Sequence, residues 1–285
     1  MIESNIAFPN LGLYFDINNV AISIGNLSIY WYALIIVTGI ISAYFFAARI
    51  AKKEDISADT LSDVVLWAIP SAIVFARVYY VIFNFADYKN NFGAVFNIRG
   101  GGIAIYGAII GACLSTYIYS RVKKISIWKV LDVGAFGLII GQAVGRWGNF
   151  VNQEAYGGNT NNIFAMTGGK IKDDLIRMQN MGLNVDPNMG VHPTFLYESL
   201  WNFFGLAVLI FVYKKLGKNK KDGQIFLSYL IWYGLGRYFI EGLRLDSLMF
   251  YQFRISQVLA GLSVIVCSVL LYLTFKNVKF RKLSE

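Results

Sequence analysis

The sequence is poor in charged residues, histidine and cysteine, and each shortage excludes a class of protein. Only 15% of the 285 residues are charged, whereas a soluble domain averages about a quarter. The one histidine, His192, leaves little material for a histidine-based metal site or for a serine or cysteine triad. Cys113 and Cys267 lie inside apolar runs, so we expect small buried side chains and not a disulfide, a metal pair or a nucleophile.

Apolar side chains, in contrast, are abundant and come in long runs. Hydrophobic residues make up 56% of the chain and aromatic residues 16%, and the mean hydropathy is +0.50. This composition predicts an integral membrane protein. The net charge of +9 is also found in nucleic-acid-binding proteins, but here the basic residues form short clusters between apolar runs. Membrane topology explains those clusters better, and we expect no nucleic-acid partner.

Seven stretches approach the length of about 20 apolar residues that crosses the hydrocarbon core of a bilayer. Glycine dilutes the third of them, and the fourth ends at Arg146. The sequence therefore predicts an all-α integral membrane fold with seven transmembrane helices. The seven stretches are approximately 27–49, 66–85, 102–120, 131–148, 195–213, 224–242 and 256–275.

Basic residues predict how these helices are oriented. The connections after the first, third, fifth and seventh stretches hold 16 of the 26 lysine and arginine residues, and residues 1–26 hold none. Because lysine and arginine collect on the cytoplasmic side, we expect the N-terminus outside and the C-terminus in the cytoplasm, with the chain in the cytoplasmic (inner) membrane. The basic clusters are Arg49, Lys52 and Lys53; Arg121, Lys123, Lys124 and Lys129; Lys214, Lys215, Lys218, Lys220 and Lys221; and Lys276, Lys279, Arg281 and Lys282.

The longest connection runs over roughly 150–194, between the fourth and fifth spans. It contains a short amphipathic piece around Asp173 to Met181 between segments rich in asparagine and glycine. Loops of this length are more often functional than mere spacers. We therefore expect one polytopic membrane domain, 1–285, with a small extracytoplasmic cap, 158–192, inserted between spans four and five.

An apolar run changes abruptly into polar residues within GLIIGQAVGRWGNFVNQEAYG, from Gly137 to Gly157. Its glycines are four residues apart, so they share one helix face where a neighbouring backbone can approach closely. Such polar density is costly at membrane depth unless it faces protein or ligand, and the stretch therefore predicts a polar site at the outer end of span four. The glycines are Gly137, Gly141 and Gly145, and the polar residues are Arg146, Asn149, Asn152 and Glu154.

Arg146 lies where the phosphodiester of an outer-leaflet lipid can reach it, and planar arginine donors can bind two phosphate oxygens at once. An isolated arginine at this level is more often an interfacial side chain that extends to water. The neighbouring Asn149, Asn152 and Glu154 reverse that preference, because they can orient the guanidinium or bind glycerol hydroxyls.

Charged residues recur near the outer end of span six and inside span two. Arg237, Glu241 and Arg244 stand at i, i+4 and i+7, so we expect them on one helix face, either as a site or as a structural ladder of ion pairs. Arg77 lies within an apolar run and needs a partner. Substrate contact and pairing with Glu154, Glu198 or Glu241 fit the sequence equally well.

Three consecutive glycines follow Arg99 and lead into span three. Gly100, Gly101 and Gly102 allow backbone geometries open to no other residue, and their amides can approach an anion. The same run is also typical of a flexible turn. On span five we expect Glu198 to pair with an arginine rather than touch substrate.

The stretch Gly145 to Glu154, with Gly157 after it, resembles the signature of the bacterial prolipoprotein diacylglyceryl transferase family. The resemblance covers most of the chain, because further matches fall in the family's order. They are Trp31-Tyr32, Gly100-Gly101-Gly102 with Tyr106-Gly107, His192-Pro193 with Leu196-Tyr197-Glu198, and Gly236-Arg237 with Glu241 and Arg244.

The resemblance implies which residues act on substrate. The arginine at the position of Arg146 binds the phospholipid, and the asparagines and glutamate of the motif belong to the essential set. It also adds Tyr32 and Gly157, and it makes Arg237 and Glu241 important for activity. Many members carry histidine where this chain has Tyr106, and because a phenol is normally protonated up to about pH 10, a donor or positioning role is expected there instead of a base.

The resemblance further implies the reaction. The diacylglyceryl group of phosphatidylglycerol passes to the thiol of the lipobox cysteine in a prolipoprotein, which forms a thioether and releases glycerol 1-phosphate. Arg146 and Arg237 can stabilise the departing phosphate, and either Glu241 or Glu154 can accept the thiol proton. No metal or organic cofactor is required. The expected partners are phosphatidylglycerol, the prolipoprotein signal peptide and membrane lipid.

Two other functions remain open from the residues alone. A transporter or flippase for an anionic lipid also needs buried arginine and glutamate, and a purely structural membrane subunit is a third reading. The polar groups gather at one face of the membrane, whereas alternating access places its site near the midplane, which mildly disfavours transport.

Overall fold

The computed structural model describes residues 5–25, 27–89, 91–97, 101–245, 249–251 and 253–276. They form two compact units. The first unit comprises the described residues of Met1–Phe46 and Gly134–Phe280, and the second comprises Ala47–Val133 wherever it is described. Arg99 and Gly100 of the predicted glycine loop, and the basic residues Lys279, Arg281 and Lys282, lie outside the described residues.

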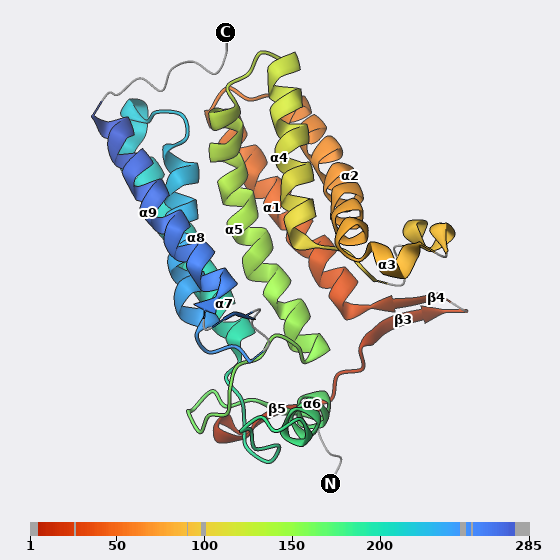
Figure 1. Cartoon of the computed structure of the whole chain (residues 1–285). Coiled ribbons are helices and arrows are strands. Elements are labelled where there is room, and N and C mark those ends of the chain that lie inside the picture. The colour runs from red at the N-terminus through yellow and green to blue at the C-terminus, as the bar shows by residue number, and fades with distance from the viewer. Residues whose placement is uncertain are drawn as a thin grey trace. The chain divides into compact units, whose positions relative to one another are not determined.

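The described chain is mostly helical (Figure 1), and each of the seven expected spans overlaps one long helix. The long helices are α1 (Trp31–Lys53), α2 (Ala58–Phe83), α4 (Ile105–Val122), α5 (Ile127–Asn152), α7 (Thr194–Leu216), α8 (Gln224–Glu241) and α9 (Ile255–Phe275). The shorter ones are α3 (Phe85–Tyr88), α6 (Gly169–Asn180), η1 (Pro9–Leu11), η2 (Phe92–Phe96) and η3 (Gly217–Asn219).

Five helical segments of the described chain are long and apolar enough to cross a membrane. They are α1, α2, α5, α9 and the segment Thr194–Asn219, which joins α7 to η3. The other two expected spans are helices of 18 residues each, α4 and α8. The prediction of a mostly helical membrane protein is thereby confirmed, whereas the number of seven spans stays a prediction.

Short strands depart from the all-α prediction, which is wrong in this respect. The strands are β1 (Ile6–Phe8), β2 (Leu13–Phe15), β3 (Val20–Ile24), β4 (Leu27–Tyr30), β5 (Thr167–Gly168), β6 (Met249–Phe250) and β7 (Phe253–Arg254). In the β3–β4 hairpin Ile24 pairs with Leu27, and Gly25, which follows Ile24 in the turn, has a φ of 58°, which glycine adopts without strain. Because β4 occupies residues 27–30, the first long helix begins at Trp31 and not at residue 27.

The segment expected as a cap is folded onto the N-terminal strands. β1 lies between β2 and β5 in an antiparallel sheet, and Ile6 pairs with both Phe15 and Gly168. Figure 1 shows α6 and β5 beside these strands at one end of the first unit. Ile6, Met166 and Leu175 are almost fully buried in a shared apolar core. Burial of these side chains, rather than chain connectivity, holds residues 5–15 against the cap.

Gln153 ties the same parts together through hydrogen bonds. Its side chain is buried, its Nε2 donates to Asn5 Oδ1 at 2.7 Å, and its Oε1 accepts from the amide of Lys170 at 3.0 Å. A buried carboxamide with both halves bonded stabilises a unique packing. The cap therefore starts at the end of α5 and is completed by the N-terminus.

Glycines lie at helix contacts in both units. In the first unit Gly141 and Gly145 of α5 face Ala43 and Ile36 of α1, but an added Cβ would meet these side chains at 4.0 and 3.5 Å, ordinary van der Waals distances. The close backbone approach expected there stays a prediction. In the second unit a Cβ on Gly107 or Gly111 of α4 would collide with the backbone of α2. Cys267 is buried as expected, whereas Cys113 is exposed because α4 packs on α2 through its glycine face.

Candidate active site

The polar motif spans the end of α5 and the turn that follows it. α5 carries Arg146 in its last two turns and ends at Asn152, after which Gln153 has a φ of 51°. This left-handed residue turns Glu154 back, so that Asn149 Nδ2 and Asn152 Nδ2 donate to Glu154 Oε1 at 3.0 and 3.3 Å. The predicted group does form, but in the structure its two amides orient the carboxylate and not the guanidinium.

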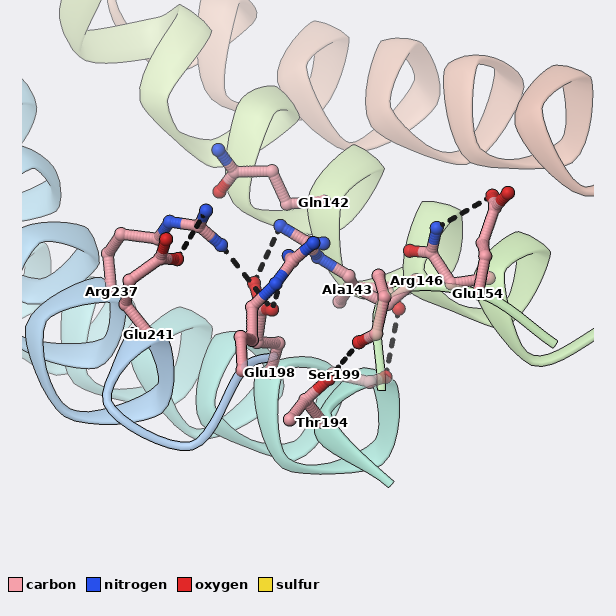
Figure 2. Close-up of polar contacts among 12 residues, drawn as sticks. Gln142, Ala143, Arg146, Glu154, Thr194, Glu198, Ser199, Arg237 and Glu241 are labelled. Carbon is pink, nitrogen blue, oxygen red and sulfur yellow. Dashed lines mark hydrogen bonds and ion pairs between the residues drawn. The ribbon is translucent and has the colours of Figure 1, made fainter. Parts of the chain in front are cut away.

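Glu198 of α7 lies at the centre of an ion cluster. Its side chain is only 6% exposed, and its Oε2 lies 2.6 Å from Arg146 Nη2. Arg237 Nη1 stands 3.7 Å from the other carboxylate oxygen, Oε1, which is too long for a hydrogen bond. Figure 2 shows Arg146 from α5 and Arg237 from α8 reaching Glu198 from opposite sides. The predicted pairing of Glu198 with an arginine is confirmed.

Arg237 and Glu241 form the second ion pair of the cluster, one helical turn apart on α8. Arg237 Nη2 lies 2.5 Å from Glu241 Oε2, and the Glu241 side chain is 2% exposed. Arg244 Nη1 stands 3.9 Å from Glu198 Oε1. The prediction that Arg244 shares the helix face is wrong, because α8 ends at Glu241. The helix stops before glycine, the residue with the least helix propensity after proline, and Arg254 Nη1 donates to the Glu241 carbonyl oxygen.

Hydrogen bonds next to the ion pairs join α5 to α7. Ser199 Oγ donates to the Ala143 carbonyl oxygen at 2.8 Å and accepts from Trp147 Nε1 at 3.1 Å. Ser199 follows Glu198, and Trp147 follows Arg146. The bond from Ser199 to Ala143 (Figure 2) joins the two helices beside the shortest ion pair of Glu198.

Gly157 lies where three segments meet. Its amide donates to the His192 carbonyl oxygen at 2.9 Å, and it forms an antiparallel bridge with Arg244. A Cβ at this position would stand 2.8 Å from both His192 Cβ and the Leu243 carbonyl oxygen. Close packing thus explains the glycine, and contact with substrate stays a prediction.

Tyr32 lies at the start of α1 against the motif itself. A Cβ on Gly148 would stand 2.7 Å from Tyr32 Cδ2, so this glycine makes room for the phenol ring. The ring remains 39% exposed. Tyr32 therefore belongs to the same unit as Arg146, and its edge stays accessible.

The cluster carries more positive than negative charge. Arg146, Arg237 and Arg244 supply three positive charges against two negative charges from Glu198 and Glu241, a net of +1 (3 − 2). Arg254 adds a further guanidinium beside the Glu241 backbone. A partly buried excess of positive charge is stabilised when an anion binds.

The second unit holds the other predicted residues. Arg77 is buried, and its guanidinium donates to the carbonyl oxygens of Val95 and Gly102 at 2.7 Å, Gly101 at 2.8 Å and Ala94 at 2.6 Å. The sequence left substrate contact and pairing with a glutamate open, and in the structure backbone carbonyl dipoles stabilise the Arg77 charge. The reason is local: φ values of 86° and 76° at Gly101 and Gly102 aim their carbonyls at it.

A cavity of about 190 Å³ is lined by Arg77, Ala94, Gly101 and Gly102, together with Tyr80, Tyr88 and Asn97. A Cβ on Gly102 would overlap Arg77 Nη1, so the glycine is required for this arrangement. Tyr106 lies in the first turn of α4, 39% exposed, with its ring centroid 6.5 Å from that of Tyr79. In the described part of the chain no three His, Cys, Asp or Glu residues are grouped to hold a metal ion.

Comparison with known proteins decides the family. The family model for prolipoprotein diacylglyceryl transferase matches residues 19–273. The chain belongs to this transferase family. A phosphatidylglycerol–prolipoprotein diacylglyceryl transferase of Listeria innocua is 47% identical over 247 residues, which cover 87% of this chain and 86% of that protein. A Bacillus cytotoxicus protein of the same name is 43% identical over 260 residues, 91% of this chain and 93% of its own.

Family membership and the five apolar helical segments make the chain a multi-pass membrane transferase. Three residues around its candidate site have larger roles in the structure than the sequence predicts. Glu198 had a signal, because a carboxylate within an apolar span needs a cation. Arg254 and Gln153 had none, since their partners lie in segments distant along the chain.

His192 lies at the border between the cap and α7, outside the helix. Its ring Nδ1 is 3.3 Å from both Asn162 Nδ2 and Tyr197 Oη. Desolvation by burial lowers the pKa of His192 below its usual 6.5. The folded transferase therefore favours the neutral ring more than the unfolded chain does.

We expect acid to destabilise the cap through His192. Because the pKa is lower in the folded state, the stabilisation is complete above about pH 6.5 and is lost as pH falls toward the folded pKa. The thermal midpoint in detergent, measured from neutral pH down to mildly acidic pH, should fall less steeply in His192→Gln. His192 is the only histidine, so an identical pH slope in both proteins contradicts the prediction.

Proposed function

We propose that the arginine cluster around Glu198 binds the phosphate of the lipid substrate. The chain transfers the diacylglyceryl group of phosphatidylglycerol to the cysteine of a prolipoprotein. The lipid carries one negative phosphodiester charge, and the cluster carries an excess of positive charge, +1 from the five groups named above with the Arg254 guanidinium beside them. This match of charge is the observation that supports the assignment.

Arg146 and Arg237 are suited to act on the phosphate together. Arg237 Nη1 stands 3.7 Å from Glu198 Oε1, attracted to it but not hydrogen-bonded. A phosphate oxygen that enters beside Glu198 takes up this donor and gains a charge-assisted bond. Glu198 then holds the two guanidiniums in place, and the asparagines with Glu154 bind the glycerol hydroxyls.

The transfer exchanges one bond for another at the glyceryl carbon. The cysteine sulfur forms the C–S bond of the thioether, while the C–O bond to phosphate breaks and its electron pair leaves with glycerol 1-phosphate. Positive side chains lower the barrier because they stabilise the charge that gathers on the departing phosphate. The same positive field raises the thiolate fraction of the incoming cysteine.

The thiol proton passes to a carboxylate, for which Glu241 and Glu154 are the two candidates. Glu241 is 2% exposed and paired with Arg237, whereas Glu154 is partly exposed and accepts from two amides. Tyr106 serves as a hydrogen-bond donor to substrate, and Tyr32, Gly157, Arg77, Gly101, Gly102 and Arg244 contribute to binding. The reaction uses no metal or organic cofactor.

Helix length and charge support a membrane placement with seven spans. The 18-residue helices α4 and α8 reach about 27 Å at 1.5 Å per residue, close to the hydrocarbon thickness of about 30 Å. Seven helices therefore span the cytoplasmic membrane, with the N-terminus outside and the C-terminus in the cytoplasm. Residues 158–192 form an extracytoplasmic cap of a single polytopic domain, and the phosphate cluster lies at the outer leaflet.

Direct assay tests the activity. Purified protein is incubated with phosphatidylglycerol and a lipobox peptide, and the peptide is analysed by mass spectrometry. We expect the peptide to gain one diacylglyceryl group for each glycerol phosphate released. A peptide that gains nothing, while labelled lipid crosses the bilayer of proteoliposomes, identifies a lipid transporter instead.

Replacing Arg146 with lysine tests phosphate binding. An ammonium cannot reproduce the two-pronged contact of a guanidinium, so Arg146→Lys should reduce turnover about a hundredfold, the loss typical of one transition-state donor. Arg49→Lys, at an exposed position near the end of α1, serves as the matched control and should leave turnover unchanged. Near-normal turnover of Arg146→Lys counts against the phosphate contact.

Tyr106→Phe removes only the hydroxyl. We expect the loss of one hydrogen bond to lower kcat/KM for phosphatidylglycerol roughly tenfold. Tyr117→Phe on the same helix, also exposed, is the control. Equal activity of the two variants shows that the Tyr106 ring packs and does not contact substrate.

A further inference from the structure

Two tryptophans lock α7 to α8 through a reciprocal contact. Trp201 Nε1 donates to the Trp232 carbonyl oxygen at 3.0 Å, and Trp232 Nε1 donates to the Trp201 carbonyl oxygen at 3.0 Å. The two indole rings stack with centroids 4.4 Å apart and planes 20° apart. Each helix therefore gives one donor to the other helix's backbone and takes one in return.

A glycine four residues after each tryptophan makes this contact possible. In an α-helix the carbonyl of residue i accepts from the amide of residue i+4, so the Cβ of residue i+4 lies beside that oxygen. At Gly205 such a Cβ would overlap the Trp232 indole, and at Gly236 it would overlap the Trp201 indole. Each helix thus supplies one indole and one glycine that leaves room for the partner's indole, which we call a glycine socket. We name the two indoles and the two glycine sockets together the tryptophan clasp.

The clasp determines how far α7 is shifted along α8. Sliding by one residue moves the helices by about 1.5 Å, which breaks both indole bonds and drives a neighbouring Cβ into an indole. Apolar contacts alone discriminate such shifts weakly, because leucine, isoleucine and phenylalanine fill similar space. Two reciprocal hydrogen bonds with two glycine sockets permit one register.

That register decides the geometry of the ion cluster. Glu198 lies three residues before Trp201 on α7, and Arg237 follows Gly236 directly on α8. α5 joins at the same level, since a Cβ on Gly205 would stand 2.8 Å from Ile139 Cδ1, and Ile139 shares a helix face with Arg146 two turns on. The three helices that carry Glu198, Arg237 and Arg146 meet at or beside the clasp.

We propose that the tryptophan clasp, formed by Trp201, Gly205, Trp232 and Gly236, is a positioning device that sets the separation of Glu198 from Arg237. The proposal rests on the phosphate role given to that cluster. The clasp does not touch substrate. It acts by keeping Arg237 Nη1 at 3.7 Å from the carboxylate, near enough for attraction but beyond hydrogen-bond length, so that this donor can turn to a phosphate oxygen beside Glu198.

Conservative substitutions separate positioning from bulk stability. Trp201→Phe and Trp232→Phe keep an apolar ring and remove the donor, while Gly236→Ala fills a socket and keeps both rings. Trp67→Phe, at a tryptophan that is 61% exposed on α2, is the control for the first pair. Gly134→Ala, where a Cβ meets nothing within 4 Å, is the control for the glycine.

Each variant is titrated with phosphatidylglycerol, and rates are divided by the amount of monodisperse folded protein. For the clasp variants we expect a raised KM and a kcat/KM lowered about tenfold or more, since displacement of about 1 Å at a reacting centre can cost about a hundredfold. The two Trp→Phe variants should match each other, and their double variant should lose less than the summed effects, because they break one coupled unit.

Normal KM and kcat per folded molecule in the clasp variants, even with a lowered thermal midpoint, overturn the proposal and leave the clasp a packing feature. Arg237→Lys in the same series separates the phosphate-binding role of the cluster from the positioning role of the clasp. If Arg237→Lys retains the wild-type KM and kcat, the phosphate role of the cluster fails. If Arg237→Lys is impaired and the clasp variants are normal, only the positioning role fails.

Discussion

One buried carboxylate organises the first unit. Glu198 lies 6% exposed among guanidiniums from α5, α8 and the turn after α8, and in surroundings of low dielectric neither sign of charge is stable alone. The charges of Arg146 and Glu198 are therefore compensated only when α5 and α7 assemble, whereas Arg237 also has Glu241 one turn along α8. The side chains that compensate one another's charges in the fold are thus the same ones that we propose bind the phosphate. An excess of positive charge is what remains for the lipid to neutralise.

Neutral contacts hold that ionic centre in place. Ser199 joins α7 to α5 next to the Arg146 ion pair, the tryptophan clasp joins α7 to α8, and Gly157 lets the cap approach the turn that carries Arg244. Hydrogen bonds with defined geometry are better suited to this task than further charges, because a carboxylate attracts any nearby cation whereas an indole and a glycine socket accept one register. The N-terminal strand completes the support by burying Ile6 in the core of the cap.

Several features were predictable because they depend on neighbours in the chain. Long apolar runs predict the helices, and the four-residue spacing of the glycines places Gly141 and Gly145 on the face of α5 that contacts α1. The motif from Gly145 to Glu154 was sufficient to indicate the transferase family that the comparisons establish. The β3–β4 hairpin also had a local signal in its alternating strands and Gly25, but the prediction began the first span near residue 27, within β4.

The sequence by itself determined the membrane class, the family and the residue types available for binding a phosphate, since these follow from composition and from uninterrupted motifs. Only the tertiary structure decided which charge meets which. It gave Glu198 and not Glu154 to Arg146, removed Arg244 from the helix face, and supplied Arg77 with backbone carbonyls in place of a carboxylate. The physical reason is that a long flexible arginine reaches several acceptors within its radius, and the choice among them depends on helix register and on backbone turns set by packing between segments far apart in sequence.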